Sequence, residues 1–299
     1  VPLSLDFDPS DRPSRNTVKE VYDQIISDMT TAISLMKNNS RSGDSSTLSD
    51  ISVKALLARV YLYKEDWNNA EAMSSAVIES LEYNLIPNDS YLDLWSNDNN
   101  SESIFEISMT DTDNVGANGI GGLYLKNSYG DYLPSSDVIS MYDSLDKRLS
   151  VFTVDNFLSG DYAPYRMEKY PDNNGSNNVK VIRLAELYLI RAEARAEIGT
   201  NISGAQKDLD VVRQRALSSA PNNSDSGQTL KDAILTERRI ELCFEGQRLW
   251  DLMRKKQDIV RNQCTSLTCK ILYASESVVL PIPQIETDIN ENIEQNPGY

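Results

Sequence analysis

Apolar residues recur at helical spacing in two separate stretches of this chain, residues 17–82 and 180–254. In the first stretch Val18, Val21 and Tyr22 begin a run in which the apolar side chains fall on one face of a helix. A helix with an apolar face is stable only when that face packs against another element. The pattern therefore predicts a mainly α-helical fold in which the helices pack as one frame.

The first helical section, residues 17–82, carries clear signals for where its helices begin. Thr17 with Glu20 three residues on is a capping box, and the helix that it opens is expected to end in the polar stretch 38–44. A second helix is expected from about residue 52 to residue 64, and Asp66 can cap a third. The short loop between the second and third helices makes them an antiparallel pair.

The second helical section, residues 180–254, repeats this design. A helix rich in alanine is expected over residues 182–198, and Ser203 with Gln206 offers a capping box for the next one. Small residues allow paired helices to approach closely, which is how tetratricopeptide-like hairpins stack. Alanines fall at nearly matching places in the two sections, at Ala58 and Ala70 and at Ala192 and Ala205. We therefore expect tetratricopeptide-like helical hairpins that form a frame.

Residues 87–179, between the two helical sections, have a different composition. They are rich in Asn, Asp, Ser, Gly and Tyr and contain only short apolar runs, such as residues 104–107. This composition predicts a large, irregular, loop-rich insertion carried on the helical frame. Residues 255–299 are expected to form an extended C-terminal segment and tail, with a short strand or extended stretch at 277–282, and the whole chain 1–299 is expected to be one domain.

The charge balance excludes some partners. Asp and Glu number 45 against 29 for Lys and Arg, and the resulting net charge of −16 repels phosphate backbones, so we expect no nucleic-acid partner. No apolar run is long enough to span a bilayer, and Val1 does not open a signal peptide. Any export signal is therefore expected to have been removed upstream of Val1.

The chain contains no histidine, which excludes Ser-His-Asp, Cys-His and zinc-His sites together. Asp111–Gly116 begins like a calcium loop but lacks the glutamate at position twelve, so it is interpreted as a turn. We expect no metal, no cofactor and no catalytic residue. Of the three cysteines, Cys243 is expected to be buried and inert, and Cys264 with Cys269 could close a small loop in an oxidising compartment.

Three glutamates, Glu237, Glu241 and Glu245, recur every four residues and are expected on one helix face. Paired carboxylates are what glycosidases use. Arginines lie beside them, however, which favours a network of ion pairs over a general acid with a raised pKa. We predict a partly buried network of Glu241, Glu245, Arg248 and Asp251.

Aromatic residues supply the candidate ligand face, because a flat ring stacks on the apolar side of a sugar. The three tryptophans, Trp67, Trp95 and Trp250, all have positions that predict a place in the core. The tyrosines of the insertion lie where no periodicity buries them, and they are compatible with either a structural role or a ligand contact. The candidate binding residues are Tyr124, Tyr129, Tyr132 and Asn127, with Tyr162, Tyr165 and Arg166 as a second group.

Four blocks of the sequence resemble the signature of the SusD/RagB family. They are residues 237–254 (ERRIELCFEGQRLWDLMR), 183–194 (RLAELYLIRAEA), 280–284 (LPIPQ) and 295–299 (QNPGY). The blocks occur in the family's order and at plausible spacing, and the resemblance covers residues 12–299.

The resemblance implies a surface-exposed lipoprotein of the outer membrane in certain Gram-negative bacteria. Such proteins are non-catalytic, bind a nutrient with an irregular part on a frame of tetratricopeptide-like helices, and pair with a SusC-like TonB-dependent transporter. Relatives carry a lipidated cysteine and a further N-terminal segment, neither of which is in this sequence. We therefore expect Val1 to mark a truncation, a proteolytic cut or the start of a shortened relative.

Three functions follow as hypotheses. The first is binding of an oligosaccharide for uptake, with the tyrosine-bearing insertion as the ligand face. The second is binding of a peptide or protein ligand. The third is a glycoside hydrolase that uses two of the many carboxylates.

Overall fold

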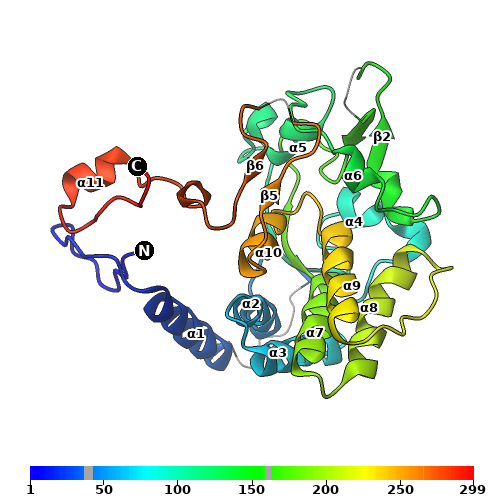
Figure 1. Cartoon of the computed structure of the whole chain (residues 1–299), viewed down its shortest axis with the longest axis horizontal. Helices are drawn as coiled ribbons and strands as arrows, with labels where there is room; N and C mark the ends of the chain where they lie inside the picture. Colours follow the sequence, from blue (N-terminus) through cyan, green and yellow to red (C-terminus); the bar gives the residue numbers. More distant parts are fainter. Residues whose placement is uncertain (37–42, 159–162, 265) are drawn as a thin grey trace. The chain divides into compact units, whose positions relative to one another are not determined.

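The computed structural model describes residues 1–36, 43–158, 163–264 and 266–299, which form two compact units. The smaller unit comprises residues 1–31 and 249–299, and the larger unit comprises residues 32–248. The larger unit contains most of the helices and all of the region predicted to be an insertion (Figure 1). The expectation of one domain over the whole chain stays a prediction.

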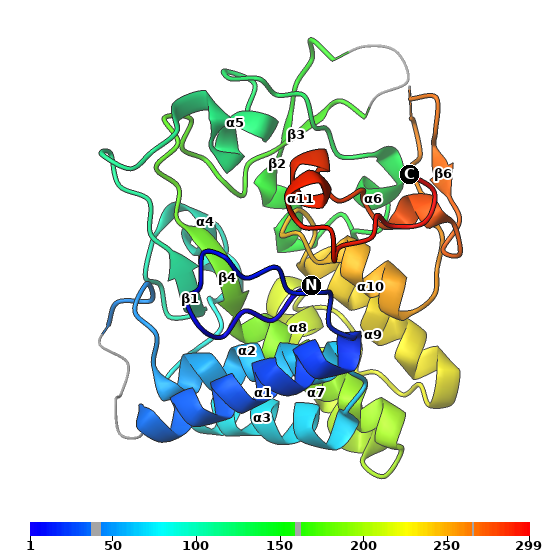
Figure 2. The same ribbon diagram turned by 90° about the vertical axis from the view of Figure 1, so that its left-hand side faces the viewer.

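Helices dominate the described residues, so the mainly α-helical class is confirmed. The long helices of the larger unit pack on one another: α2 contacts α3, α3 contacts α7, and α7 contacts both α8 and α9 (Figures 1 and 2). The tetratricopeptide-like detail of these hairpins stays a prediction. The helices are α1 (Val18–Leu35), α2 (Asp50–Tyr63), α3 (Trp67–Glu79), α7 (Leu184–Ile198), α8 (Ile202–Ala216) and α9 (Gly227–Glu241).

The start of α1 follows the sequence signal. The backbone N–H of Thr17 donates to a Glu20 carboxylate oxygen at 2.8 Å, and the N–H of Glu20 donates to the Thr17 hydroxyl at 3.2 Å. The predicted capping box is therefore confirmed.

The start of α8 differs from the prediction. The side chain of Asn201 accepts the N–H of Gly204 at 3.0 Å and caps the helix, which begins at Ile202. The Gln206 side chain donates to the carbonyl of Asp225 at 2.7 Å, so it takes no part in a capping box. Ser203 was the wrong choice because an asparagine two residues earlier offers an equally good cap.

The region 87–179 has short helices and strands but is not loosely attached. Strand β1 (Ser103–Ile107) pairs antiparallel with β4 (Val179–Arg183), which joins the beginning of the region to its end. Strand β2 (Phe152–Val154) pairs antiparallel with β3 (Tyr165–Met167). The short helices are α4 (Asp93–Ser96), α5 (Ile120–Tyr124) and α6 (Ser136–Ile139).

Buried apolar residues hold this region against the helical frame. One core cluster lies where α2, α3 and α7 meet, and a second lies between α7, α8 and α9. A third cluster combines aromatic residues of the region 87–179, among them Tyr91, Trp95 and Tyr170, with Ile240 and Cys243. The irregular region therefore has its own core, anchored on the end of α9.

Helix α9 ends at Glu241, four residues before Glu245. Phe244 and Gly246 adopt the left-handed backbone conformation, with φ of 63° and 79°, which breaks the helix. A new helix, α10 (Arg248–Arg254), follows. The expectation that Glu237, Glu241 and Glu245 share one helix face was therefore wrong for Glu245.

In the smaller unit the two chain ends are hydrogen-bonded to each other. Arg15 donates to the side chain of Asn296 at 2.9 Å, and Asn290 donates to the carbonyl of Pro13 at 2.9 Å. Residues 276–278 form a 3-10 turn and residues 279–283 are not helical, so the stretch 277–282 is only partly extended. The remaining elements are the hairpin of β5 (Ile259–Val260) and β6 (Lys270–Ile271), and α11 (Gln284–Ile289).

The cysteines behave as the sequence suggested. Cys264 and Cys269 form a disulfide, and Cys243 is buried as a free thiol. Among the residues placed by the structure, no helix is both long and apolar enough to cross a membrane.

Candidate functional site

A cavity of about 270 Å³ opens among the loops of the region 87–179. Its wall comes from three segments: the loop after α5, the hairpin of β2 and β3, and the loop around Pro171. Two of the predicted binding residues, Asn127 and Arg166, line it. Lys126, Thr153, Asp155 and Glu168 supply further polar groups.

The buried carboxylate of Asp155 organises this cavity. It accepts hydrogen bonds from the Lys126 ammonium at 2.8 Å, from the Arg166 guanidinium at 3.1 Å and from the backbone N–H of Phe157 at 3.1 Å. These bonds, that of Lys126 most of all, lower the pKa of Asp155 to about 2. Asp155 is therefore ionised at neutral pH and holds two cationic donors at the wall of the cavity.

Arg166 also connects the cavity to the loop that carries the predicted tyrosines. Its guanidinium donates to the carbonyl of Gly130, which lies between Tyr129 and Tyr132 in the sequence. Gly130 has a φ of 59°, and a Cβ there would lie 2.5 Å from the Arg166 guanidinium, so only glycine fits. Tyr129 and Tyr132 are 55% and 58% exposed, and the Tyr129 hydroxyl bonds the side chain of Asn118 at 3.2 Å.

Two other predicted residues, Tyr124 and Tyr165, are half-buried. The Tyr124 ring lies 6.2 Å from that of Tyr170 in a stacked arrangement and meets Phe244 edge-on at 5.5 Å. Tyr165 packs against the same core cluster. The centroid of the Tyr124 ring is also 6.2 Å from that of Tyr132, so the half-buried ring packs near the exposed one. Tyr162 lies outside the described residues.

The structure thus places Tyr129 and Tyr132 on one loop, tied through Arg166 to the cavity that Asn127 lines. Sequence reasoning missed Phe157, which is 85% exposed and has the Lys126 ammonium 4.1 Å from its ring centroid. The available signal was an apolar pair, Phe157 and Leu158, that follows Asp155 and Asn156 within the loop-rich region.

The tryptophans follow the prediction in two cases of three. Trp95 is buried, and Trp67 packs partly buried against the core of α2, α3 and α7. Trp250 is 57% exposed, so its assignment to the core was wrong. Trp250 lies in α10, within the block 237–254 that resembles the family signature, and that position alone does not bury it.

A buried ionic network lies beneath the third core cluster. Arg183, 1% exposed, donates to the carboxylates of Glu102, Glu241 and Glu245. Burial alone would raise the pKa of Glu241, but Arg215, Arg183 and Arg148 outweigh it and hold the pKa well below its ordinary value. Glu241 is therefore ionised at neutral pH and has a structural role.

The predicted membership of this network needs correction. Glu241 belongs to it, and Glu245 reaches it from beyond the helix end through Arg183 and Lys169. Arg248 is exposed, and its place in the partly buried network stays a prediction. Asp251 is buried and bonds Arg254 at 2.8 Å. The cations that face Glu241 come from distant parts of the sequence, which spacing along a helix does not reveal.

Two of the three glutamates, Glu241 and Glu245, lack the properties of a general acid. A general acid needs a raised pKa and access to substrate, whereas the pKa values of Glu241 and Glu245 are lowered by their cationic partners and both side chains are buried. No group of three acidic, cysteine or histidine side chains that could hold a metal ion occurs among the described residues.

Comparison with known proteins gives a consistent result. The sequence matches the model of the SusD family over residues 27–299. SusD-like protein P2 of Formosa agariphila is 28% identical, over 99% of this chain and 69% of that protein. The crystal structure of a SusD superfamily protein from Bacteroides thetaiotaomicron superimposes with a TM-score of 0.87 at 30% identity, covering 99% of this chain and 70% of that one. The starch-binding protein SusD of the same species is 30% identical over 50% of this chain and 26% of its own length.

Proposed function

This chain belongs to the SusD family, and from that premise we propose that it is a non-catalytic protein that binds oligosaccharides. The observation that carries the proposal is the pair of exposed tyrosines, Tyr129 and Tyr132, beside a polar cavity. One relative is a starch-binding protein, which supports a carbohydrate ligand here.

The proposed face combines the two kinds of contact that a sugar requires. Sugars are well hydrated, so a binding protein gains most from aromatic rings that cover the C–H side of the pyranose. Tyr129 and Tyr132 offer such rings, and Phe157 offers a third. Lys126 and Asn127, both exposed at the cavity, can hydrogen-bond the hydroxyl groups.

We further propose that the protein acts at the surface of the outer membrane and delivers its ligand to a SusC-like TonB-dependent transporter. A lipid anchor outside this sequence would attach it there. Both statements rest on membership of the family.

Alanine variants of the two exposed tyrosines test the proposed ligand face, and a third exposed tyrosine serves as the control. Tyr129→Ala and Tyr132→Ala should each weaken oligosaccharide binding about tenfold, because an aromatic contact contributes roughly 0.5–1.5 kcal/mol beyond its buried area. Their melting temperatures should stay near that of the parent, since both side chains are exposed. Tyr299→Ala is the matched control, because Tyr299 is 56% exposed in the smaller unit.

Glycan arrays followed by titration calorimetry would measure the effect, with peptide pools offered in parallel. Unchanged affinity in both tyrosine variants would refute this ligand face. Binding of peptides but of no glycan would establish the peptide hypothesis, and release of reducing sugar would establish the hydrolase.

A further inference from the structure

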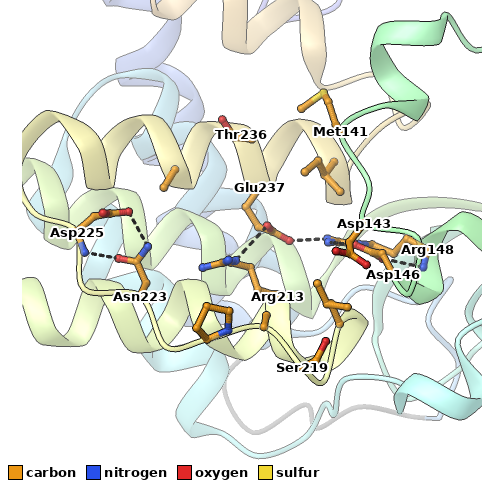
Figure 3. Close-up of a pocket in the computed structure, with 15 residues that line it drawn as sticks. Met141, Asp143, Asp146, Arg148, Arg213, Ser219, Asn223, Asp225, Thr236 and Glu237 are labelled. Atoms are coloured by element: carbon orange, nitrogen blue, oxygen red, sulfur yellow. Dashed lines mark hydrogen bonds and ion pairs between the residues drawn. The ribbon is translucent and has the colours of Figure 1, made fainter.

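A second and larger cavity, of about 540 Å³, lies between the helical frame and the loop 141–148 (Figure 3). Its wall includes the end of α8, one side of α9 and the connection between these helices. It shares no lining residue with the cavity beside the tyrosines. Its volume lies in the range of small-molecule sites, roughly 300–1,000 Å³.

Arg213 presents unused hydrogen-bond donors to this cavity. Its side chain is 28% exposed, and its two acidic neighbours, Asp210 and Glu237, lie 3.8 and 3.9 Å away. These distances exceed hydrogen-bonding range, and no hydrogen bond joins the Arg213 guanidinium to any residue that the structure describes. A guanidinium carries five N–H groups, so Arg213 has donors available for a ligand.

Glu237 presents an unused acceptor next to these donors. Its side chain is 6% exposed, and its Oε1 atom accepts from Arg148 at 2.5 Å. The other oxygen, Oε2, lies 3.9 Å from the Arg213 Nε atom and accepts no hydrogen bond from the residues that are described. Figure 3 shows Glu237 pointing into the space between Arg213 and Arg148. This acceptor, on a side chain that is almost fully buried, is therefore available to a hydrogen-bond donor from solution.

The charges that line the cavity select the kind of partner. Four carboxylates and two guanidiniums line it, an excess of two formal negative charges, which opposes an anionic ligand. An ammonium group at Glu237 would lie beside the Arg213 cation, which opposes a cationic ligand. A neutral hydroxyl group avoids both penalties, because it can accept from Arg213 and donate to Glu237 at once.

We propose that this cavity is a second carbohydrate site, which takes one neutral sugar residue through Arg213 and the Oε2 atom of Glu237. Met141, Leu217 and Pro221 line the same cavity and would cover the C–H groups of the sugar ring. None of the described residues that line it is aromatic, so it favours a single residue over a long stacked chain. The inference does not depend on the tyrosine face, since the two cavities are built from different residues.

Saturation-transfer NMR on the whole chain tests this site with a panel of D-glucose, D-galactose, D-mannose, D-xylose, L-fucose and N-acetylglucosamine. D-glucuronate and D-glucosamine serve as the anionic and cationic probes. At least one neutral sugar should bind the parent protein, and Arg213→Met should weaken it by about tenfold or more through loss of charged donors. Because the Arg213 guanidinium makes no hydrogen bond to the residues that the structure describes, this variant should keep the parent's melting temperature.

Thr236→Phe provides a second variant, since Thr236 is exposed on the wall of the cavity and a phenylalanine there would reduce the space left for a sugar residue. It should also abolish monosaccharide binding, while the double variant Tyr129→Ala with Tyr132→Ala should retain it. Absence of binding by every neutral sugar would overturn the inference, as would stronger binding of a charged probe. Binding lost in the tyrosine variant but kept in Arg213→Met would overturn it while supporting the tyrosine face.

Discussion

Arg183→Met should destabilise the larger unit strongly, because this arginine is the centre of the buried ionic network. Its guanidinium makes five hydrogen bonds at 2.5–2.9 Å, four to the carboxylates of Glu102, Glu241 and Glu245 and one to the carbonyl of Glu241. Methionine fills a similar volume but donates nothing. The three glutamates would remain buried with fewer partners.

The expected loss of unfolding free energy depends on the partners that the buried glutamates keep after the substitution. A hydrogen bond to a charged group is worth roughly 1.5–3 kcal/mol, so five of them give an upper limit of roughly 7–15 kcal/mol. The loss should be smaller, because Arg215 still faces Glu102 and Glu241, and Lys169 still faces Glu245. Removing one member of a buried ion pair costs about 3–5 kcal/mol, and we expect a value in this range.

Urea unfolding followed by tryptophan fluorescence and by circular dichroism would measure the change. The ring of Trp95 lies 5.6 Å from the Arg183 guanidinium, so its emission should report on this region. Arg239→Met is the matched control, because Arg239 pairs with Asp137 at 2.6 Å with both side chains about a third exposed. That change should cost about 0.2–1 kcal/mol. Equal unfolding midpoints for the two variants would refute the importance of the network.

Three further predictions concern the helix cap, the thiols and the pH dependence. Asn201→Ala should lower the free energy of unfolding by about 1 kcal/mol and Ser203→Ala by less than about 0.5 kcal/mol. If Ser203→Ala lowered the melting temperature more than Asn201→Ala, Ser203 would be the helix cap. A thiol reagent should react rapidly with no cysteine of the native chain, with one cysteine after unfolding and with three after a reductant is added. More than one reactive cysteine without reductant would exclude the disulfide. Burial alone would raise the pKa values of Glu241 and Glu245, but their cationic partners lower both. The stability that these two carboxylates provide is therefore present above the unfolded pKa of about 4.3 and is lost as the pH falls below it. Burial raises the pKa of Glu237, which acts in the opposite direction and offsets part of this loss. A urea midpoint that stays constant from about pH 6 to about pH 3 would contradict this reasoning.

Local features of the fold were predictable from the sequence because they depend on neighbours within one or two helical turns. The capping box at Thr17 and the helical hairpin that Asp66 introduces were correct. The predictions were wrong where a second local feature, close in the sequence, determined the helix boundary instead. Asn201 replaced Ser203 as a cap, and the left-handed conformation at Phe244 broke a helix that apolar spacing alone would have continued.

The tertiary structure alone decided which charged groups meet. Arg183 and Glu245 are 62 residues apart in sequence, and Arg183 and Glu102 are 81 apart. No periodicity marks such a pair, because the contact depends on how β1, β4 and the end of α9 come together. For this reason the sequence identified Glu241 as part of an ionic network but did not identify its partners Arg148, Arg183 and Arg215.

The same distinction applies to the candidate sites. Composition selected Tyr129 and Tyr132, which are exposed, but it also selected Tyr124 and Tyr165, which pack half-buried against the core. Only the structure places Arg166 between the loop of the exposed tyrosines and a cavity, and only the structure brings Arg213 of α8 beside Glu237 of α9. A cavity is a property of segments that meet in space, and the physical signal for it, a polar group left without a partner after folding, does not exist until the chain has folded.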